Sequence, residues 1–245
     1  MRRVTHFVSP MITWLMMSGC AAFAQGPTSR PAQTVQTFKK EVTKAFEYKY
    51  LLYLPKEYGT PDKKWPLVLF LHGAGERGTH IEAVKRHGPP KLIAAGREFP
   101  FIVASPQCPA KRWWDPAALD ALIDEIVAKY AVDESRIYLT GLSMGGYGTW
   151  NLACHHPERF AAIAPICGGG IPYLAREQLA KTPTWVFHGA KDPVVAPSES
   201  TRMVDMLKQT NPNVKLTMYP NADHDSWTRT YDSPEFYSWL LSHKR

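Results

Sequence analysis

The chain is predicted to fold as an α/β protein with a mostly parallel central sheet covered by helices on both faces. Short apolar runs alternate along the sequence with segments in which apolar residues recur at three- and four-residue spacing. Several runs are apolar at nearly every position, which is typical of strands buried on both faces. With 245 residues, 44% of them hydrophobic and 21% charged, the chain is long enough for a single domain with a large core.

The apolar runs, taken in chain order, are the predicted strands. They are Tyr48–Leu54, Leu67–Leu71, Phe101–Ser105, Ile137–Thr140, Ala161–Ile166, Thr184–His188 and Val214–Tyr219. In parallel sheets of this kind, functional groups gather at the carboxyl ends of the strands. The residues that follow each run are therefore the first candidates for a site.

The segments with helical periodicity lie between these strands. In Pro116–Tyr130, apolar residues from Leu119 to Val127 recur at helical spacing, and Asp115 is the predicted N-cap. The predicted helices are Pro116–Tyr130, Met144–His155, Ser198–Gln209 and Pro234–Ser242. Strands that alternate with helices in this way favour a parallel sheet.

Residues 1–24 are predicted to be a secretory signal peptide and not part of the fold. Arg2 and Arg3 give a positive start, an apolar stretch follows from about Met11, and Ala22–Ala24 resembles a cleavage site. The apolar stretch is too short to span a bilayer, which takes about 20 residues. We expect cleavage after Ala24, export to the periplasm or the medium, and no stable membrane insertion.

The same segment contains one alternative signal. Met17–Cys20 resembles a bacterial lipoprotein box, which would place a lipid on Cys20, but methionine stands where that box usually has leucine. We therefore favour the cleaved signal peptide. Residues 25–34 are rich in Gly, Pro, Thr, Ser and Gln and are predicted to be a flexible leader, and residues 35–245 to be a single catalytic domain.

Charge and composition exclude several classes of function. The net charge is +7, but no run of basic residues exceeds two, so a nucleic-acid partner is not expected. Zinc-ligand spacing, a phosphate-binding Gly-x-x-x-x-Gly-Lys loop and a dinucleotide fingerprint are all missing from the sequence, so no metal and no cofactor are expected. The oligomeric state stays open.

Three cysteines follow the signal segment, namely Cys108, Cys154 and Cys167. In an exported protein two of them can form one disulfide and leave one thiol. The sequence does not say which pair forms, or whether any pair forms.

Residues 141–145 read GLSMG and form a G-x-S-x-G motif around Ser143. The motif lies between a predicted strand and a predicted helix, which is the context it requires, although a glycine-rich turn can match by chance. Glycine at 141 and 145 removes side chains that would collide in so tight a turn. The helix that follows directs free N–H groups at any oxyanion formed on the serine. Ser143 is therefore the candidate nucleophile.

A serine hydroxyl needs a base to accept its proton, and in this kind of fold the chain order is serine, acid, histidine. Asp192 follows one predicted strand, and His224 follows the next. They are the candidate acid and base, although Asp192 also suits a turn. His72 and His188 each precede a glycine at a strand end, where a histidine supports a site more often than it acts as the base.

Residues 72–78, HGAGERG, follow the strand Leu67–Leu71. Small residues there allow backbone N–H groups to point into the site, and one of them, with the N–H of Met144, can form an oxyanion hole. We favour Ala74, with Gly73 and Gly75 as alternatives.

These motifs, in this order over about residues 48–243, resemble the α/β-hydrolase superfamily. Residues 72–78, residues 105–109 (SPQCP) with Trp113, and residues 224–227 (HDSW) are similar to small secreted bacterial esterases of the feruloyl esterase and polyhydroxybutyrate depolymerase group, also described as prolyl oligopeptidase-like or as phospholipase/carboxylesterase. The resemblance implies an α/β-hydrolase fold and hydrolysis of carboxylic esters. Ser143 would attack the ester, His224 would carry the proton, and Asp192 would orient the imidazole.

Substrate contacts are expected from the same loops. The segment Cys167–Pro183 is too short for the large helical lid of lipases, so we expect no lid domain and an open cleft. Gln107 and Trp113 follow a strand end, and Trp227 follows the base, so the three are candidate substrate contacts, although such aromatics also pack under loops. A feruloyl or acetyl ester, free or on polysaccharide, is compatible with this cleft.

Two other functions are compatible with the sequence. A serine peptidase of the prolyl oligopeptidase type shares the serine motif, but the propeller that gates that family is missing from this sequence. A non-catalytic carbohydrate-binding or scaffold protein on the same fold is the second alternative. Such proteins usually lose a member of the triad, and here all three candidates are present.

Overall fold

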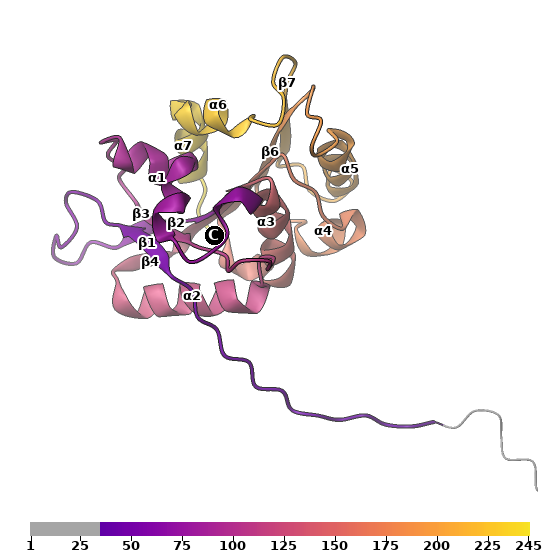
Figure 1. Cartoon of the computed structure of the whole chain (residues 1–245), viewed down its shortest axis with the longest axis horizontal. Helices are drawn as coiled ribbons and strands as arrows, with labels where there is room; N and C mark the ends of the chain where they lie inside the picture. Colours follow the sequence, from indigo (N-terminus) through magenta and orange to yellow (C-terminus); the bar gives the residue numbers. More distant parts are fainter. Residues whose placement is uncertain (1–34) are drawn as a thin grey trace, which may run out of the picture. The chain divides into compact units, whose positions relative to one another are not determined.

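The structure is a computed structural model that describes residues 35–245 (Figure 1). Contacts divide the chain into two units, with the boundary between Lys44 and Ala45. Residues 35–44, the described part of the first unit, are exposed and form no helix or strand. The predicted signal peptide with its cleavage after Ala24, the lipid site at Cys20 and the leader 25–34 lie outside the described residues.

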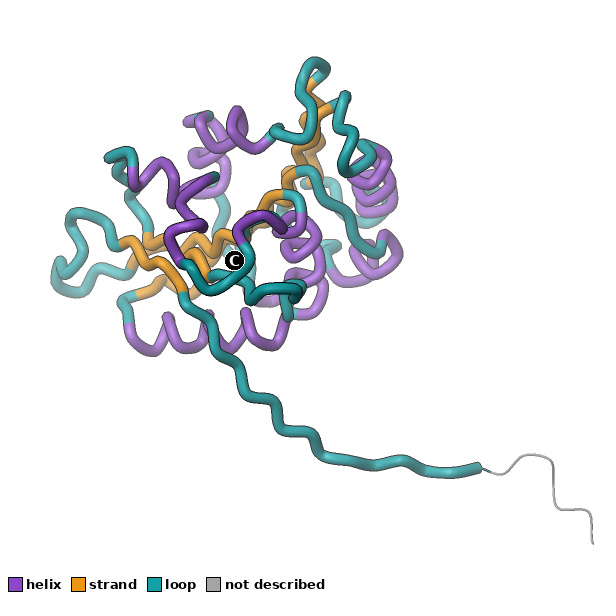
Figure 2. Tube along the Cα trace, in the orientation of Figure 1, coloured by secondary structure: helices purple, strands orange, loops and turns teal. Residues whose placement is uncertain are grey.

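The second unit is built on one seven-stranded sheet with the order β1-β3-β2-β4-β5-β6-β7 (Figure 2). The edge strand β1 runs antiparallel to β3, and all other neighbours in the sheet are parallel. This confirms the mostly parallel sheet. The strands are β1 (Tyr50–Tyr53), β2 (Trp65–Leu71), β3 (Ile102–Pro106), β4 (Val132–Leu142), β5 (Ala162–Ile166), β6 (Thr184–Gly189) and β7 (Val214–Tyr219).

Helices cover both faces of this sheet, as expected (Figure 1). Helices α2, α3, α4 and α5 contribute to the core on one face, and α1, α6 and α7 contribute to the core on the other. The helices are α1 (Gly88–Ala94), α2 (Pro116–Lys129), α3 (Met144–His155), α4 (Pro172–Gln178), α5 (Ser198–Leu207), α6 (Trp227–Asp232) and α7 (Pro234–Leu241).

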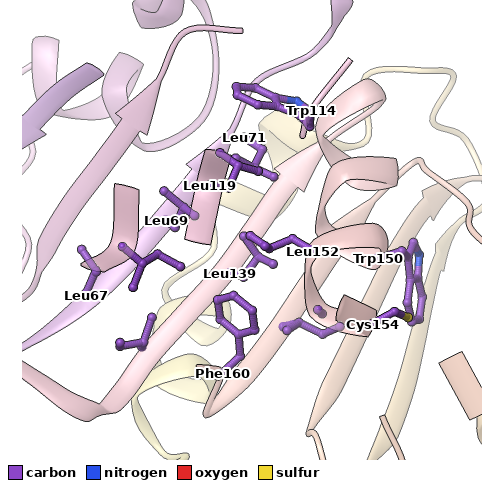
Figure 3. Packing of buried hydrophobic residues seen from close by; sticks show 14 of the residues in the cluster. Leu67, Leu69, Leu71, Trp114, Leu119, Leu139, Trp150, Leu152, Cys154 and Phe160 are labelled. Atoms are coloured by element: carbon purple, nitrogen blue, oxygen red, sulfur yellow. The ribbon is translucent and has the colours of Figure 1, made fainter. Parts of the chain in front are cut away.

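Strand β2 shows why the sheet needs helices on both sides. Successive side chains of a strand point to opposite faces. Leu67, Leu69 and Leu71 belong to the core on the α2–α3 face (Figure 3), and Val68 and Phe70 belong to the core on the other face. All five are essentially inaccessible to solvent. Because a fully buried aliphatic side chain contributes about 1.5–3 kcal/mol, covering both faces strongly stabilises the sheet.

The predicted elements agree with the observed ones, with differences mainly at their ends. Helix α3 and strand β7 have the predicted bounds, whereas β4 begins five residues earlier than Ile137, at Val132. Helices α1, α4 and α6 were not predicted, because six or seven residues are too few to show a helical period. Between β5 and β6 the chain forms only the short helix α4, so the expected absence of a large lid domain is confirmed.

Within residues 35–245, every helix is too short or too polar to cross a membrane.

Candidate active site

The candidate site lies at the carboxyl end of the parallel strands. Ser143 follows β4, which is central in the sheet, while Asp192 follows β6 and His224 follows β7. Since these strands run parallel, the three loops leave the sheet at the same edge, and residues far apart in the sequence meet there.

The turn that carries Ser143 is strained. Its backbone has φ 53° and ψ −117°, which an L-residue seldom adopts. The turn is also crowded, because a side chain at Gly141 would strike the carbonyl of Gly145, and one at Gly145 would strike the carbonyls of Leu71 and His72. The Ser143 N–H donates to the carbonyl of Ile166 at 2.9 Å, which ties the turn to β5. The two glycines are therefore required on steric grounds.

The side chains of Ser143, His224 and Asp192 form one hydrogen-bonded series. His224 Nε2 lies 3.0 Å from Ser143 Oγ, and His224 Nδ1 lies 2.7 Å from Asp192 Oδ2. A carboxylate at Nδ1 favours the tautomer with its proton on Nδ1, which leaves Nε2 as an acceptor for the serine hydroxyl. The structure thus brings together the three residues that the sequence singled out, in the expected order.

Asp192 is held in its ionised form by its surroundings. Burial by itself raises the pKa of this carboxyl, but the hydrogen bonds from His224 and from the Val195 and Val194 amides outweigh it and lower the pKa below its usual value. The two amide bonds, to Oδ1, are 2.9 and 2.8 Å long. Buried His188 adds a contact, with Nε2 3.1 Å from Asp192 Oδ2. The carboxylate is therefore fixed in place as well as charged.

Two backbone N–H groups that follow the ends of β2 and β4 are the candidates for the oxyanion hole. The amide of Met144 opens helix α3, and the amide of Ala74 opens a 3-10 turn, Ala74–Glu76, at the end of β2. Neither amide has an acceptor within the described part of the chain. His72 supports this turn through both ring nitrogens. Its Nδ1–H donates to the carbonyl of Gly73 at 2.6 Å, and its Nε2 accepts from the Cys108 N–H at 3.0 Å.

His72 supports the loop in its neutral form. Burial lowers the pKa of this imidazole to about 4, so it stays uncharged at neutral pH. This agrees with the expectation that His72 and His188 support the site and are not its base. His188 is fully buried, and its two ring nitrogens contact Ser200 Oγ and the Val195 carbonyl.

The three candidate substrate contacts, Gln107, Trp113 and Trp227, differ in how exposed they are. Gln107 is buried, and its amide nitrogen donates to the carbonyls of Glu76 and His80, so its N–H groups hold the loop and are not free for a substrate. Its Oε1 accepts no hydrogen bond within residues 35–245, so a substrate contact through this oxygen stays a prediction. Trp113 is 63% exposed, and Trp227 is only 9% exposed.

Trp227 lies against the base. Its ring meets the His224 ring edge-on, with centroids 5.1 Å apart, and its indole N–H donates to His87 Nδ1 at 3.3 Å. Trp227 thereby limits the movement of the His224 imidazole. The contact of His87 with this network was not anticipated, because His87 lies in a loop that carries no motif.

Cys167 is a further neighbour that sequence reasoning did not place. Its Sγ lies within 4.8 Å of ligand atoms of Asp192 and His224. Burial raises the pKa of this thiol to about 12, so it stays protonated, and the other two groups already hydrogen-bond each other. This chemistry does not favour a metal ion. Cys108, Cys154 and Cys167 are all free and buried, which answers the open question of pairing among them.

Comparisons with known proteins identify a family for this chain. The model of the Dienelactone hydrolase family matches residues 112–236. The chain is 27% identical over 190 residues to poly(3-hydroxyalkanoate) depolymerase C of Paucimonas lemoignei, covering 58% of this chain and 44% of that protein. It is 26% identical over 169 residues to the probable feruloyl esterase C of Aspergillus terreus, covering 66% of this chain and 61% of that protein.

A solved structure is also similar. A crystal structure described as a thermostable esterase is 36% identical, with a TM-score of 0.72, and covers 82% of this chain and 60% of that one. A structure described as a ferulic acid esterase has a TM-score of 0.59 at 18% identity, over 78% of this chain and 92% of that one, which is a likeness of fold alone. This chain spans about half the length of the first relative and about three fifths of the length of the second.

Proposed function

Because the chain belongs to the dienelactone hydrolase family of α/β-hydrolases, we propose that it is an exported serine esterase that hydrolyses carboxylic esters. Ser143 is the nucleophile, His224 the general base and acid, and Asp192 the group that orients His224. The observation that carries the proposal is the 3.0 Å contact between Ser143 Oγ and His224 Nε2, backed by the 2.7 Å contact between His224 Nδ1 and Asp192.

The first half of the reaction forms an acyl-enzyme. Ser143 Oγ attacks the ester carbonyl while its proton passes to His224 Nε2. Asp192, charged at neutral pH, stabilises the imidazolium that results. The proton then moves from Nε2 to the leaving alcohol, and the C–O bond to that alcohol breaks. In the second half, water attacks the acyl-enzyme with His224 again accepting a proton, and Ser143 is released.

The negative charge on the carbonyl oxygen needs donors in place before the reaction. The amides of Met144 and Ala74 are the proposed oxyanion hole, with Gly73 and Gly75 as alternatives to Ala74. The N-terminus of α3 adds its positive dipole end. Each well-placed donor of this kind is worth about 3–4 kcal/mol in the transition state.

The proposed substrates are small-molecule or polysaccharide-linked carboxylic esters, with feruloyl and acetyl esters the first to test. The names of the relatives, poly(3-hydroxyalkanoate) depolymerase and feruloyl esterase, are compatible with this range. The ring of Trp113, which is 63% exposed in the loop after β3, also supports it, since an exposed aromatic offers a surface for a ring of the substrate.

The test is a comparison of the purified wild type with Ser143→Ala on p-nitrophenyl acetate. We expect kcat to fall by several orders of magnitude, because the nucleophile is lost. Ser198→Ala, at an exposed serine of α5, is the matched control and should keep full activity. A fluorophosphonate probe should label the wild type and Ser198→Ala, and not Ser143→Ala.

Two further results would distinguish the esterase from its alternatives. Turnover of a proline-anilide peptide in preference to esters would identify a peptidase. Failure of the fluorophosphonate to label folded wild type would identify a non-catalytic protein on this fold.

We also propose that residues 1–24 are a signal peptide cleaved after Ala24, that residues 25–34 are a leader, and that residues 35–245 are the catalytic part. The motif at the start of the sequence supports this. Intact-mass measurement of protein recovered from the periplasm or medium tests it. A mass that begins at residue 25 is expected, and a lipid-modified Cys20 at the new N-terminus would overturn it.

A further inference from the structure

We propose that Glu76 and His87 are positioning residues for the base of the candidate site. Together they hold the ring of Trp227 against His224, and so keep His224 Nε2 within reach of Ser143. The proposal rests on the esterase function proposed above and adds to it two side chains that touch neither the nucleophile nor the base.

Glu76, His87 and Trp227 form a bridge between the two halves of the site. Glu76 ends the 3-10 turn Ala74–Glu76, whose first amide is the proposed oxyanion donor. His87 precedes α1, and Trp227 opens α6, directly after the loop that carries His224. Helices α1 and α6 are in contact with each other. The bridge therefore connects the turn of the oxyanion hole to the loop of the base.

The hydrogen bond between Trp227 and His87 fixes the orientation of the indole. Trp227 Nε1–H donates to His87 Nδ1 at 3.3 Å, and the two rings meet at 65° with centroids 5.3 Å apart. The same indole stands at 89° to the His224 imidazole, with centroids 5.1 Å apart. Because protein interiors are closely packed, a rotation of the indole would push the imidazole or open a gap beside it. The position of the base thus depends on the acceptor at His87.

This hydrogen bond requires one tautomer of His87. Since Nδ1 accepts the indole proton, it carries no proton of its own, and the ring proton is on Nε2. His87 Nε2 lies 3.8 Å from Glu76 Oε1, so a carboxyl group faces the nitrogen that must be protonated. Glu76 therefore favours the tautomer that Trp227 needs. In the same way, the Asp192 carboxylate favours the tautomer of His224 that Ser143 needs.

Glu76 occupies a position that does not favour stability. The residue is only 5% exposed, and within residues 35–245 neither of its carboxyl oxygens accepts a hydrogen bond. The ring nitrogens that face it, on His87 and His72, lie 3.8 and 3.9 Å away, and the one on His72 already donates to the Gly73 carbonyl. Burying a carboxylate without hydrogen bonds costs free energy of folding. The positioning role explains Glu76 better than stability does.

The first test separates the acceptor of His87 from the rest of its side chain. His87→Leu removes the acceptor for the indole N–H, whereas His87→Asn places an acceptor oxygen near the position of Nδ1. We expect kcat on p-nitrophenyl acetate to fall about 10- to 100-fold in His87→Leu with little change in KM, because the base is displaced from the serine. His87→Asn should recover most of this loss. His155→Leu, at an exposed position of α3, is the matched control and should keep full activity.

Trp227→Phe tests the same hydrogen bond from the donor side. It keeps an aromatic ring beside His224 and removes the indole N–H, so kcat should again fall. Combining it with His87→Leu should cause little further loss, because both changes remove one and the same bond. Losses that multiply in the double variant would overturn the proposal. So would a rise in KM at unchanged kcat in His87→Leu, which is the result expected of a side chain that binds substrate.

Glu76→Gln distinguishes positioning from a structural role. The amide lacks the negative charge that favours the His87 tautomer, so kcat should fall by about tenfold. The urea midpoint of unfolding should stay the same or rise, because a buried charge is removed. Glu82→Gln, at an exposed position nearby, is the matched control and should leave kcat unchanged. A fall in the midpoint of Glu76→Gln, or an unchanged kcat, would contradict the role given to Glu76.

An NMR measurement on substrate-free protein separates failure of the bridge from failure of the esterase. The indole N–H signal that is missing from Trp227→Phe belongs to Trp227. His87→Leu should shift this signal and the ring signals of His224, and His155→Leu should shift neither. If these signals respond but no ester is hydrolysed, the bridge stands and the esterase is wrong. If esters are hydrolysed while His87→Leu changes neither kcat nor the His224 signals, the esterase stands and the bridge is wrong.

Discussion

At the scale of the residue, the candidate site depends on backbone geometry as much as on side-chain chemistry. Ser143 keeps its strained φ of 53° because the surrounding backbone leaves no other path, with Gly145 packed against the carbonyls of Leu71 and His72. A residue held in such a conformation costs about 1–3 kcal/mol, and the packing of the sheet offsets that cost.

We predict that Gly145→Ala destabilises the protein by roughly 3 kcal/mol or more, because the new methyl group has no space. Gly75→Ala is the matched control for stability, since a methyl group there meets no atom within 4 Å. Urea unfolding followed by circular dichroism measures both. Equal midpoints for the two variants would contradict the steric argument.

Asp192→Asn should lower kcat by about 10³–10⁴-fold, because the amide cannot hold the required tautomer or stabilise the imidazolium. Asp223→Asn, in the exposed loop beside His224, should have little effect. Steady-state kinetics on p-nitrophenyl acetate at pH 7 is the measurement. Similar losses in both variants would assign the effect to the loop and not to the carboxylate.

The same carboxylate predicts a dependence of stability on pH. Its pKa is lower in the folded protein than the usual 3.8, so its stabilising effect is present above about 3.8 and is lost as the pH falls toward the folded value. The stability advantage of the wild type over Asp192→Asn should therefore shrink between pH 5 and pH 3. Thermal unfolding at several pH values measures it, and an advantage that grows in acid would have the wrong sign.

The sequence predicts the catalytic candidates better than the substrate contacts, for a physical reason. Ser143, Asp192 and His224 are identified by their place after strands, and parallel strands bring those places together. The direction of a side chain within a loop depends on packing from other segments. Gln107 shows this, because carbonyls of Glu76 and His80 draw its amide under the loop.

At the scale of the element, helix α2 is fixed at its start by one side chain. Asp115 Oδ1 accepts from the amides of Ala117 and Ala118 at 3.1 and 3.4 Å. Apolar residues such as Leu119 and Ile123 then bury one face of the helix against the sheet. Cap and period were both visible in the sequence, which is why this helix was predicted to within one residue.

Asp115→Ala should destabilise the protein by about 1 kcal/mol, the usual cost of losing an N-cap. Asp115→Asn retains an acceptor oxygen and should lose less. Chemical denaturation measures the two free energies of unfolding. Equal losses in the two variants, which both lack the charge, would show that the charge, and not the acceptor oxygen, is what matters at this position.

The elements that were not predicted are short and irregular. Helix α1 contains two prolines, at Pro89 and Pro90, and α4 and α6 have fewer than two full turns. Each forms because the sheet presents an apolar face to cover, and not because its own sequence has a marked helical period. Such helices depend on tertiary packing, which a sequence pattern does not contain.

At the scale of the whole molecule, Cys108, Cys154 and Cys167 are all buried as free thiols. Burial raises the pKa of Cys108 to about 11 and of Cys154 and Cys167 to about 12. Native protein that begins at residue 25 should therefore react very slowly with a thiol reagent, and after denaturation its three cysteines should all react. A colorimetric thiol assay without reductant, before and after denaturation, measures this. Fewer than three thiols after denaturation would reveal a disulfide.

Strand β7 lies at one edge of the sheet, and the candidate base His224 follows it. This strand pairs only with β6, its side chains after Val214 are partly accessible, and the loop after it carries His224. Edge strands unfold locally at a lower free energy than the strands in the middle of a sheet. Esterase activity should therefore be lost at a lower urea concentration than the circular dichroism signal. Loss of activity would then report local unfolding of β7 while the rest of the sheet is still folded.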